Sequence, residues 1–130
     1  MKIVFYEQDQ KVSPNLFSDR AEELAKKLAS DNKHQAKVNK RTQVRKFYDE
    51  VLRLENVSNS RPDQWEAILP QIHMLVAKAA YARGRELVSD EFLEFVKSSV
   101  QQIQSSGDLS LFSGFFEAMM GFYRLHGPKN

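Results

Sequence analysis

Residues 108–125 read DLSLFSGFFEAMMGFYRL, and this stretch decides the fold. If it is helical, its apolar side chains cover almost the whole circumference, and only a narrow strip of polar and small residues interrupts them. A helix of this kind is either buried at the centre of a domain or covered by another subunit. The sequence therefore predicts a central helix that needs several other helices around it.

Four further segments show the spacing of amphipathic helices, and they precede the central helix in the chain. Residues 18–32 start with Ser18 as N-cap, and residues 42–55 start with Thr42 as N-cap. The next helix covers residues 62–83, with Pro62 in its first turn and Gly84 as its stop. Ser89 caps a fourth helix, which ends before Gly107.

Pro70 lies inside the third of these segments. Proline has no amide hydrogen and clashes with the preceding turn, so a kink is expected near residues 66–70, or two helices in place of one. Together the five segments predict an all-α protein, a single compact bundle of about five helices over residues 1–130. Residues 1–17 and the polar, aperiodic stretch 33–41 are expected to be flexible.

Composition narrows the class of protein. The 130 residues include 42% apolar residues and no cysteine, which fits one globular domain without disulfides or thiolate metal sites. No apolar run approaches the ~18 residues of a membrane span, and the N-terminal residues lack the core of a signal peptide. A cytoplasmic protein with no membrane partner is the expectation.

The sequence contains no pattern typical of catalysis. Phosphate-binding glycine loops and the nucleophile elbow are both missing. The three histidines, His34, His73 and His126, are scattered without the spacing of metal ligands. Neither enzymatic activity, nor a metal, nor a cofactor is predicted.

Positive charge is concentrated in one part of the chain. The net charge is only +2, yet residues 26–46 contain eight basic residues and a single acidic one, Asp31. Four of these basic residues surround the expected start of the second helix, where a docked phosphate would relieve their conflict with the helix dipole. They are Lys40, Arg41, Arg45 and Lys46. The alternative is a solvated lysine-rich surface without a ligand.

A second basic cluster lies at the end of the third helix. Met74, Lys78, Tyr81 and Arg85 follow one another at spacings of 4, 3 and 4, close to one helix face, and Arg83 is adjacent. An aromatic ring between two cations suits single-stranded or splayed RNA. The alternative is that these cations only complement the helix dipole and that Tyr81 belongs to the core.

Three blocks resemble the small subunit of the type III-A CRISPR interference complex, the Csm effector. They are NKRTQVRKFYDEVLRL at 39–54, LPQIHMLVAKAAYARGRELVSDEFLEF at 69–95 and LFSGFFEAMMGFYR at 111–124. The resemblance covers about residues 39–125 and implies a small all-helical protein of antiviral defence that has no catalytic activity. Cleavage and signalling would belong to other subunits.

The resemblance also implies partners and a binding surface. Several copies stack into a filament beside the other Csm subunits, and they contact guide RNA and target RNA through sugar and phosphate without reading bases. Such stacking would use apolar residues of the last helix, namely Phe115, Phe116, Met119, Met120 and Phe122. The alternative is that a central helix buries these side chains within the single chain. The matched basic residues become candidates for RNA contact: Lys40, Arg41, Arg45, Lys46, Lys78, Arg83 and Arg85.

Two other functions remain open. A helical adaptor or regulator that oligomerises would use its basic patch for an acidic protein. A metal-dependent ribonuclease would cleave RNA and stop when a chelator is added.

Overall fold

A computed structural model describes residues 2–130 of the chain, and it is built from five α-helices. The helices are α1 (Ala21–His34), α2 (Arg41–Ser60), α3 (Trp65–Gly84), α4 (Asp90–Val100) and α5 (Ser106–His126). Two short turns of helix precede α1 and α3: η1 (Leu16–Arg20) and η2 (Pro62–Gln64). The prediction of an all-α bundle of about five helices is confirmed.

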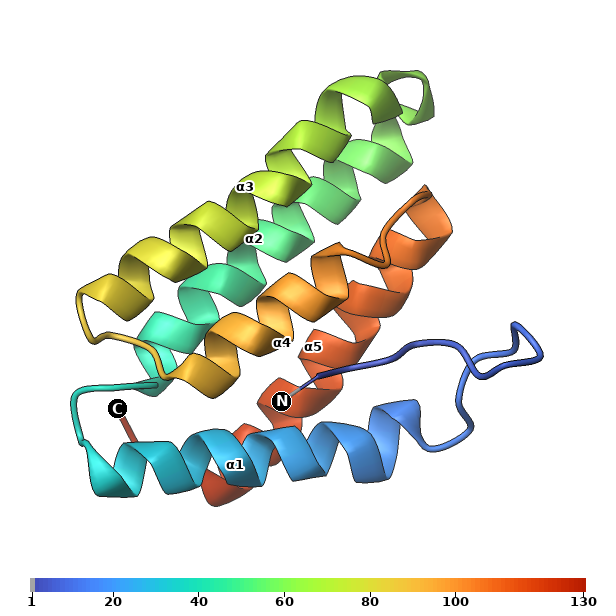
Figure 1. Cartoon of the computed structure of the whole chain (residues 1–130). Coiled ribbons are helices and arrows are strands. Elements are labelled where there is room, and N and C mark those ends of the chain that lie inside the picture. The colour runs from blue at the N-terminus through green and yellow to red at the C-terminus, as the bar shows by residue number, and fades with distance from the viewer. Residues whose placement is uncertain (1) are drawn as a thin grey trace.

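Figure 1 shows how the helices are arranged. Helices α2 and α3 run side by side in opposite directions, and α4 returns beside α3. Helix α5 packs against α2 and α1, and α1 crosses at the lower edge of the view. Helix α3 therefore lies at the edge of the bundle, with α2 and α4 as its main neighbours.

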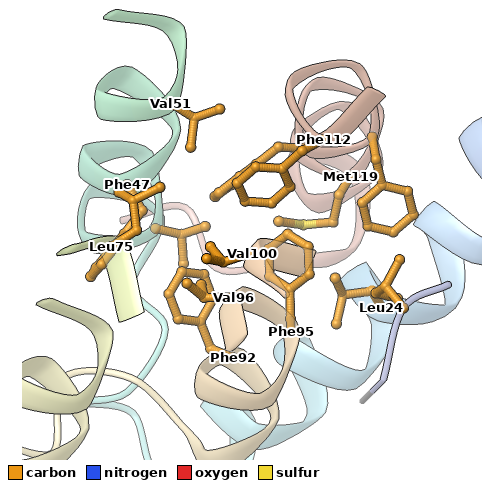
Figure 2. Packing of buried hydrophobic residues seen from close by; sticks show 14 of the residues in the cluster. Leu24, Phe47, Val51, Leu75, Phe92, Phe95, Val96, Val100, Phe112 and Met119 are labelled. Atoms are coloured by element: carbon orange, nitrogen blue, oxygen red, sulfur yellow. The ribbon is translucent and has the colours of Figure 1, made fainter. Parts of the chain in front are cut away.

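Aromatic rings from α4 and α5 fill the centre of the core (Figure 2). Phe95 lies with its ring centroid 5.2 Å from that of Phe116 and 5.8 Å from that of Phe112, and Phe92 lies 5.9 Å from Phe95. These side chains are completely buried, and each such burial stabilises the fold by roughly 1.5–3 kcal/mol. The apolar sequence of α5 is thus explained by its central position.

Three of the five apolar residues of α5 considered for stacking are buried within the chain, as the alternative of a central helix predicts. Phe115, Phe116 and Met119 are completely buried inside the protein, and Met120 and Phe122 are partly buried against the same core. Helix α5 packs against both α1 and α2.

The N-terminal segment packs onto α4. Ile3 and Phe5 are buried, and Phe5 stacks near Phe112 at a centroid distance of 6.4 Å. The amide of Ile3 donates to Ser98 Oγ at 3.1 Å, and Gln102 Nε2 donates to the carbonyl of Ile3 at 2.5 Å. This segment, expected to be flexible, contributes two side chains to the core because alternate residues of an extended strand point to the same side.

The segment between α1 and α2 is shorter than expected and partly buried. Residues 33 and 34 complete α1, and Val38 and Asn39 are buried. Asn39 has a positive φ of 58°, a conformation that asparagine tolerates better than most residues. The backbone amide of Asn39 donates to the carbonyl of Leu87, and Tyr123 Oη donates to the backbone carbonyl of Asn39 at 2.5 Å.

Several predicted helix boundaries are wrong. Ser18 lies within η1 and its hydroxyl donates to the Asn15 carbonyl, so it does not cap α1. Lys40, rather than Thr42, is the N-cap of α2. Helix α2 continues five residues beyond 55, because Val57 packs against the core and Ser58 is buried. Helix α4 ends at Val100, earlier than predicted.

Pro70 does not divide α3 into two helices, so that alternative is wrong. The amide hydrogen that proline lacks would have bonded to the carbonyl of Glu66, in the first turn of α3. Pro70 itself is exposed, so water can solvate the carbonyl left without a partner. None of the helices within residues 2–130 has the length and hydropathy needed to cross a bilayer.

Candidate nucleic-acid interface

A groove between α2 and α3 brings one residue of the first predicted basic cluster, Lys46, beside residues of the second. It has a volume of about 420 Å³. Three basic residues line the groove. Lys46 lies in the second turn of α2, Lys78 lies near the end of α3, and Arg85 directly follows α3. The antiparallel course of the two helices places the beginning of α2 beside the end of α3, which explains why residues 32 or more positions apart share one surface.

Tyr81 forms part of the same groove and is 60% exposed. The prediction that Tyr81 lies on the surface beside basic residues is supported, and the alternative that it belongs to the core is wrong. The guanidinium carbon of Arg85 lies 5.7 Å from the centre of the Tyr81 ring. This cation–π contact holds a positive charge beside an exposed aromatic face.

The groove also contains an acidic residue that the sequence analysis did not identify. Glu50 of α2 lies opposite Lys78, with 3.3 Å between Lys78 Nζ and Glu50 Oε2. Arg53 donates to both oxygens of the same carboxylate, from Nε to Oε1 at 2.8 Å and from Nη2 to Oε2 at 2.9 Å. The hydrogen bonds from Arg53, and then those from Lys78, hold the pKa of Glu50 below its ordinary value. Glu50 is therefore charged at neutral pH and fixes the position of Lys78.

Lys46 and Arg85 form no ion pair with the described residues 2–130. Both side chains belong to exposed residues. Two of the three cations in the groove are thus available to an anion from outside, and the third is shared with Glu50.

The other predicted site residues lie outside this groove. Arg45 points to Asp49 one turn further along α2, at 3.8 Å. Arg83 binds Asp90 at the start of α4, at 2.6 Å, and it lines a different hollow beside the end of α1. Lys40 is exposed at the N-cap of α2, and Arg41 donates to the carbonyl of Lys129.

The first amides of α2 are partly occupied within the chain itself. Both the amide and the hydroxyl of Thr42 donate to the Asn130 oxygen, each at 3.3 Å. The expected phosphate at this helix start would have to displace residues 129 and 130. The groove beside it presents its cations without such competition.

The described residues contain no group of three or more histidine or acidic side chains that could hold a metal ion. His126 pairs with Glu22 at 2.7 Å, and His34 Nδ1 lies 2.8 Å from the carbonyl of Ser30. The remaining histidine, His73, is exposed on α3. The histidines are as scattered in space as they are in the sequence.

Comparison with protein families gives one match. The family described as Csm2 Type III-A matches residues 11–129, a range that includes every helix and all of the groove. Neither the curated proteins nor the solved structures contain a significant match. The family match extends the resemblance found in the sequence to residues 11–38, which the three blocks did not cover.

Proposed function

Because the chain belongs to the Csm2 family of type III-A CRISPR systems, whose members are small subunits of the Csm complex, we propose that it binds the backbones of guide RNA and target RNA within that complex. It catalyses no reaction itself, and cleavage belongs to other subunits. It works in the cytoplasm, in contact with other Csm subunits and with further copies of itself.

One observation carries the proposal: the groove between α2 and α3 collects Lys46, Lys78 and Arg85 around an exposed tyrosine. Lysine and arginine contact phosphates without regard to base sequence, and an aromatic ring stacks on any base. A protein that holds a guide must accept every guide sequence, since base pairing supplies the specificity. The chemistry of the groove meets this requirement.

The candidate residues contribute unequally. Lys46, Lys78, Tyr81 and Arg85 form the centre of the interface. Lys40, Arg41 and Arg45 extend it along the start of α2, where a longer strand passes. Arg83 contributes least, because Asp90 already neutralises it on the other side of α3.

The test compares two double variants in the assembled Csm complex. Lys46→Ala with Arg85→Ala removes the two groove cations that form no ion pair. Lys26→Ala with Lys33→Ala removes the same charge from exposed positions of α1 and serves as the control. We expect the first variant to lose RNA affinity about tenfold or more, roughly 1.4 kcal/mol, and the control to stay within twofold.

The result is interpreted only for protein that folds. Circular dichroism and thermal unfolding of each variant should match the natural chain, since all four residues are exposed. Equal RNA retention by the folded groove variant and the control would contradict the proposed site. Partners that stay bound after nuclease treatment, with no RNA bound before it, would favour a protein adaptor instead.

A further inference from the structure

Residues 127–130, which we name the strap, follow α5 and turn back across the start of α2. Arg41 donates to the carbonyl of Lys129. The amide and the hydroxyl of Thr42 both donate to the Asn130 oxygen. Figure 1 shows the end of the chain beside the first turn of α2. The strap therefore covers donors that a phosphate at this helix start would use.

The root of the strap is fixed by contacts with α5 and α1. The amide of Gly127 donates to the carbonyl of Tyr123 at 2.8 Å, and His126 pairs with Glu22 of α1 at 2.7 Å. Gly127 passes so close to Tyr123 that a Cβ there would lie 2.7 Å from the carbonyl oxygen. Pro128 follows, and its ring restricts the φ angle at that position. These constraints keep the tip of the strap near the start of α2 even when its contacts there break.

The tip of the strap is held more loosely than the root. Both hydrogen bonds of Thr42 measure 3.3 Å, whereas N–H···O bonds in proteins are most often about 2.9–3.0 Å long. Thr42, Lys129 and Asn130 are all exposed. Exposed hydrogen bonds with little apolar packing belong to the parts of a protein that open most easily. The tip can therefore open while the rest of the fold stays closed.

The strap lies next to the groove. Gln43, directly after Thr42, lines the groove, as does Lys46 in the second turn of α2. Arg41 and Lys46 are five positions apart, which corresponds to roughly 7.5 Å along the helix axis. A single strand that is bound at Lys46 can therefore extend to Arg41, where it meets the strap.

We infer that the strap is an autoinhibitory contact, which competes with RNA for Arg41 and Thr42 and is displaced when a strand binds. A phosphate carries a full negative charge and several acceptor oxygens, so it binds an arginine and a helix amide more strongly than a backbone carbonyl does. The closed strap lowers the apparent affinity in proportion to the fraction of molecules that it keeps closed. This inference rests on the function proposed above and adds a regulation of the same interface.

The first experiment compares the natural chain with a chain that ends at Gly127. The deletion of residues 128–130 removes the tip of the strap and also the positive charge of Lys129. We expect the affinity for a labelled single-stranded RNA of about 12 nucleotides to rise about threefold or more, as it does when the strap closes at least about two-thirds of the molecules. Loss of a cation alone predicts weaker binding instead.

The matched control keeps the backbone of the strap and changes its side chains. Lys129→Ala with Asn130→Ala leaves the main-chain oxygens in place and should bind RNA no more tightly than the natural chain. Circular dichroism and thermal unfolding establish that each chain is folded. Equal or weaker binding by the folded, shortened chain would overturn the inference.

The second experiment tests whether the strap and RNA share Arg41. In the shortened chain Arg41 no longer donates to residue 129, so Arg41→Ala should weaken RNA binding about threefold or more. In the natural chain the same substitution also removes a contact of the strap, and the two effects offset each other to less than about twofold. Equal losses in the two chains would show that the strap does not compete for this side chain.

The third experiment observes the displacement itself in a chain of full length. The sequence contains no cysteine, so Asn130→Cys accepts a single nitroxide label, and the main-chain oxygen of residue 130 is unchanged. We expect the mobility of the label to increase when RNA saturates the protein. A label whose spectrum stays the same while RNA binds would overturn the inference.

The results separate the strap from the groove. RNA binding that falls in the Lys46→Ala, Arg85→Ala double variant but is indifferent to the deletion rejects the strap and leaves the groove. Tighter binding by the shortened chain without any loss in the double variant rejects the groove and leaves the strap. Absence of RNA binding by every chain rejects both.

Discussion

Lys78 Nζ lies 3.3 Å from Glu50 Oε2 and joins the two walls of the groove through one ion pair. The same carboxylate accepts two hydrogen bonds from Arg53 on its own helix. One acidic group thus orders two cations, and it lowers the positive potential of a surface that otherwise attracts phosphate. Removal of the Glu50 charge should therefore strengthen RNA binding and lower the free energy of unfolding.

Replacement of Glu50 by glutamine is expected to strengthen RNA binding by about three- to tenfold. The change removes a negative charge from the groove and leaves Lys78 free to meet a phosphate, an effect of about 1 kcal/mol at low salt. Fluorescence anisotropy with a labelled single strand measures it, and Glu117→Gln, at an exposed position of α5, is the control. Weaker binding by Glu50→Gln would mean that Glu50 holds Lys78 in its binding position.

The same substitution predicts a pH dependence of stability. Because the pKa of Glu50 in the fold lies below its ordinary 4.5, the charged form stabilises the folded chain. The natural protein should therefore exceed Glu50→Gln in free energy of unfolding at neutral pH. The difference should be fully present above about pH 4.5 and should shrink as the pH falls through the lowered pKa. Denaturant unfolding of both chains between pH 7 and pH 3 measures this, and a constant difference would contradict it.

The helices could be predicted because their evidence is local. Val44, Phe47 and Val51 repeat at helical spacing, and the structure buries all three. The groove depends instead on how two helices pair, which spacing within one helix does not reveal. Arg83 and Arg85 line different hollows, because side chains two positions apart point to nearly opposite sides of a helix. A count of charges along the sequence does not distinguish Glu50 from other acidic residues, because its two ion-pair partners lie on two different helices.

Asn39 belongs to the polar stretch 33–41, which the sequence predicts to be flexible, yet it joins three parts of the fold. Its side-chain amide donates to Leu28 of α1 at 3.3 Å and to Ser89 Oγ at 2.8 Å, and its Oδ1 accepts from the Ser89 amide at 3.0 Å. A polar residue type suggested exposure, whereas complete hydrogen bonding makes its burial possible.

Asn39→Gly and Asn39→Ala are predicted to differ in stability although both delete the same hydrogen bonds. Alanine also has to adopt the positive φ of 58°, which costs roughly 1–2 kcal/mol, whereas glycine adopts it without strain. Asn39→Ala should therefore unfold at lower denaturant concentration than Asn39→Gly. Equal midpoints would show that the backbone relaxes out of this conformation.

Phe5→Ala is expected to lower the free energy of unfolding by about 3–5 kcal/mol, as for a buried aromatic residue in a core. Val4→Ala, next to it and 56% exposed, should change it by less than about 0.5 kcal/mol. Thermal unfolding of the two variants separates a packed N-terminal segment from one that contributes little. Similar values for both would place residues 3–5 outside the cooperative core.

The salt dependence of RNA binding tests how many cations of the groove contact phosphate. Each neutralised phosphate of a single strand contributes about −0.7 to the slope of log affinity against log salt. Contacts from Lys46, Lys78 and Arg85 alone give a slope near −2, and contributions from Lys40 and Arg41 extend it to about −3.5. In the Lys46→Ala, Arg85→Ala double variant the slope should become shallower by about 1.4 units, with equal effects on strands of different sequence. An unchanged slope at reduced affinity would mean that these two residues act through the conformation of the groove rather than by contact with phosphate.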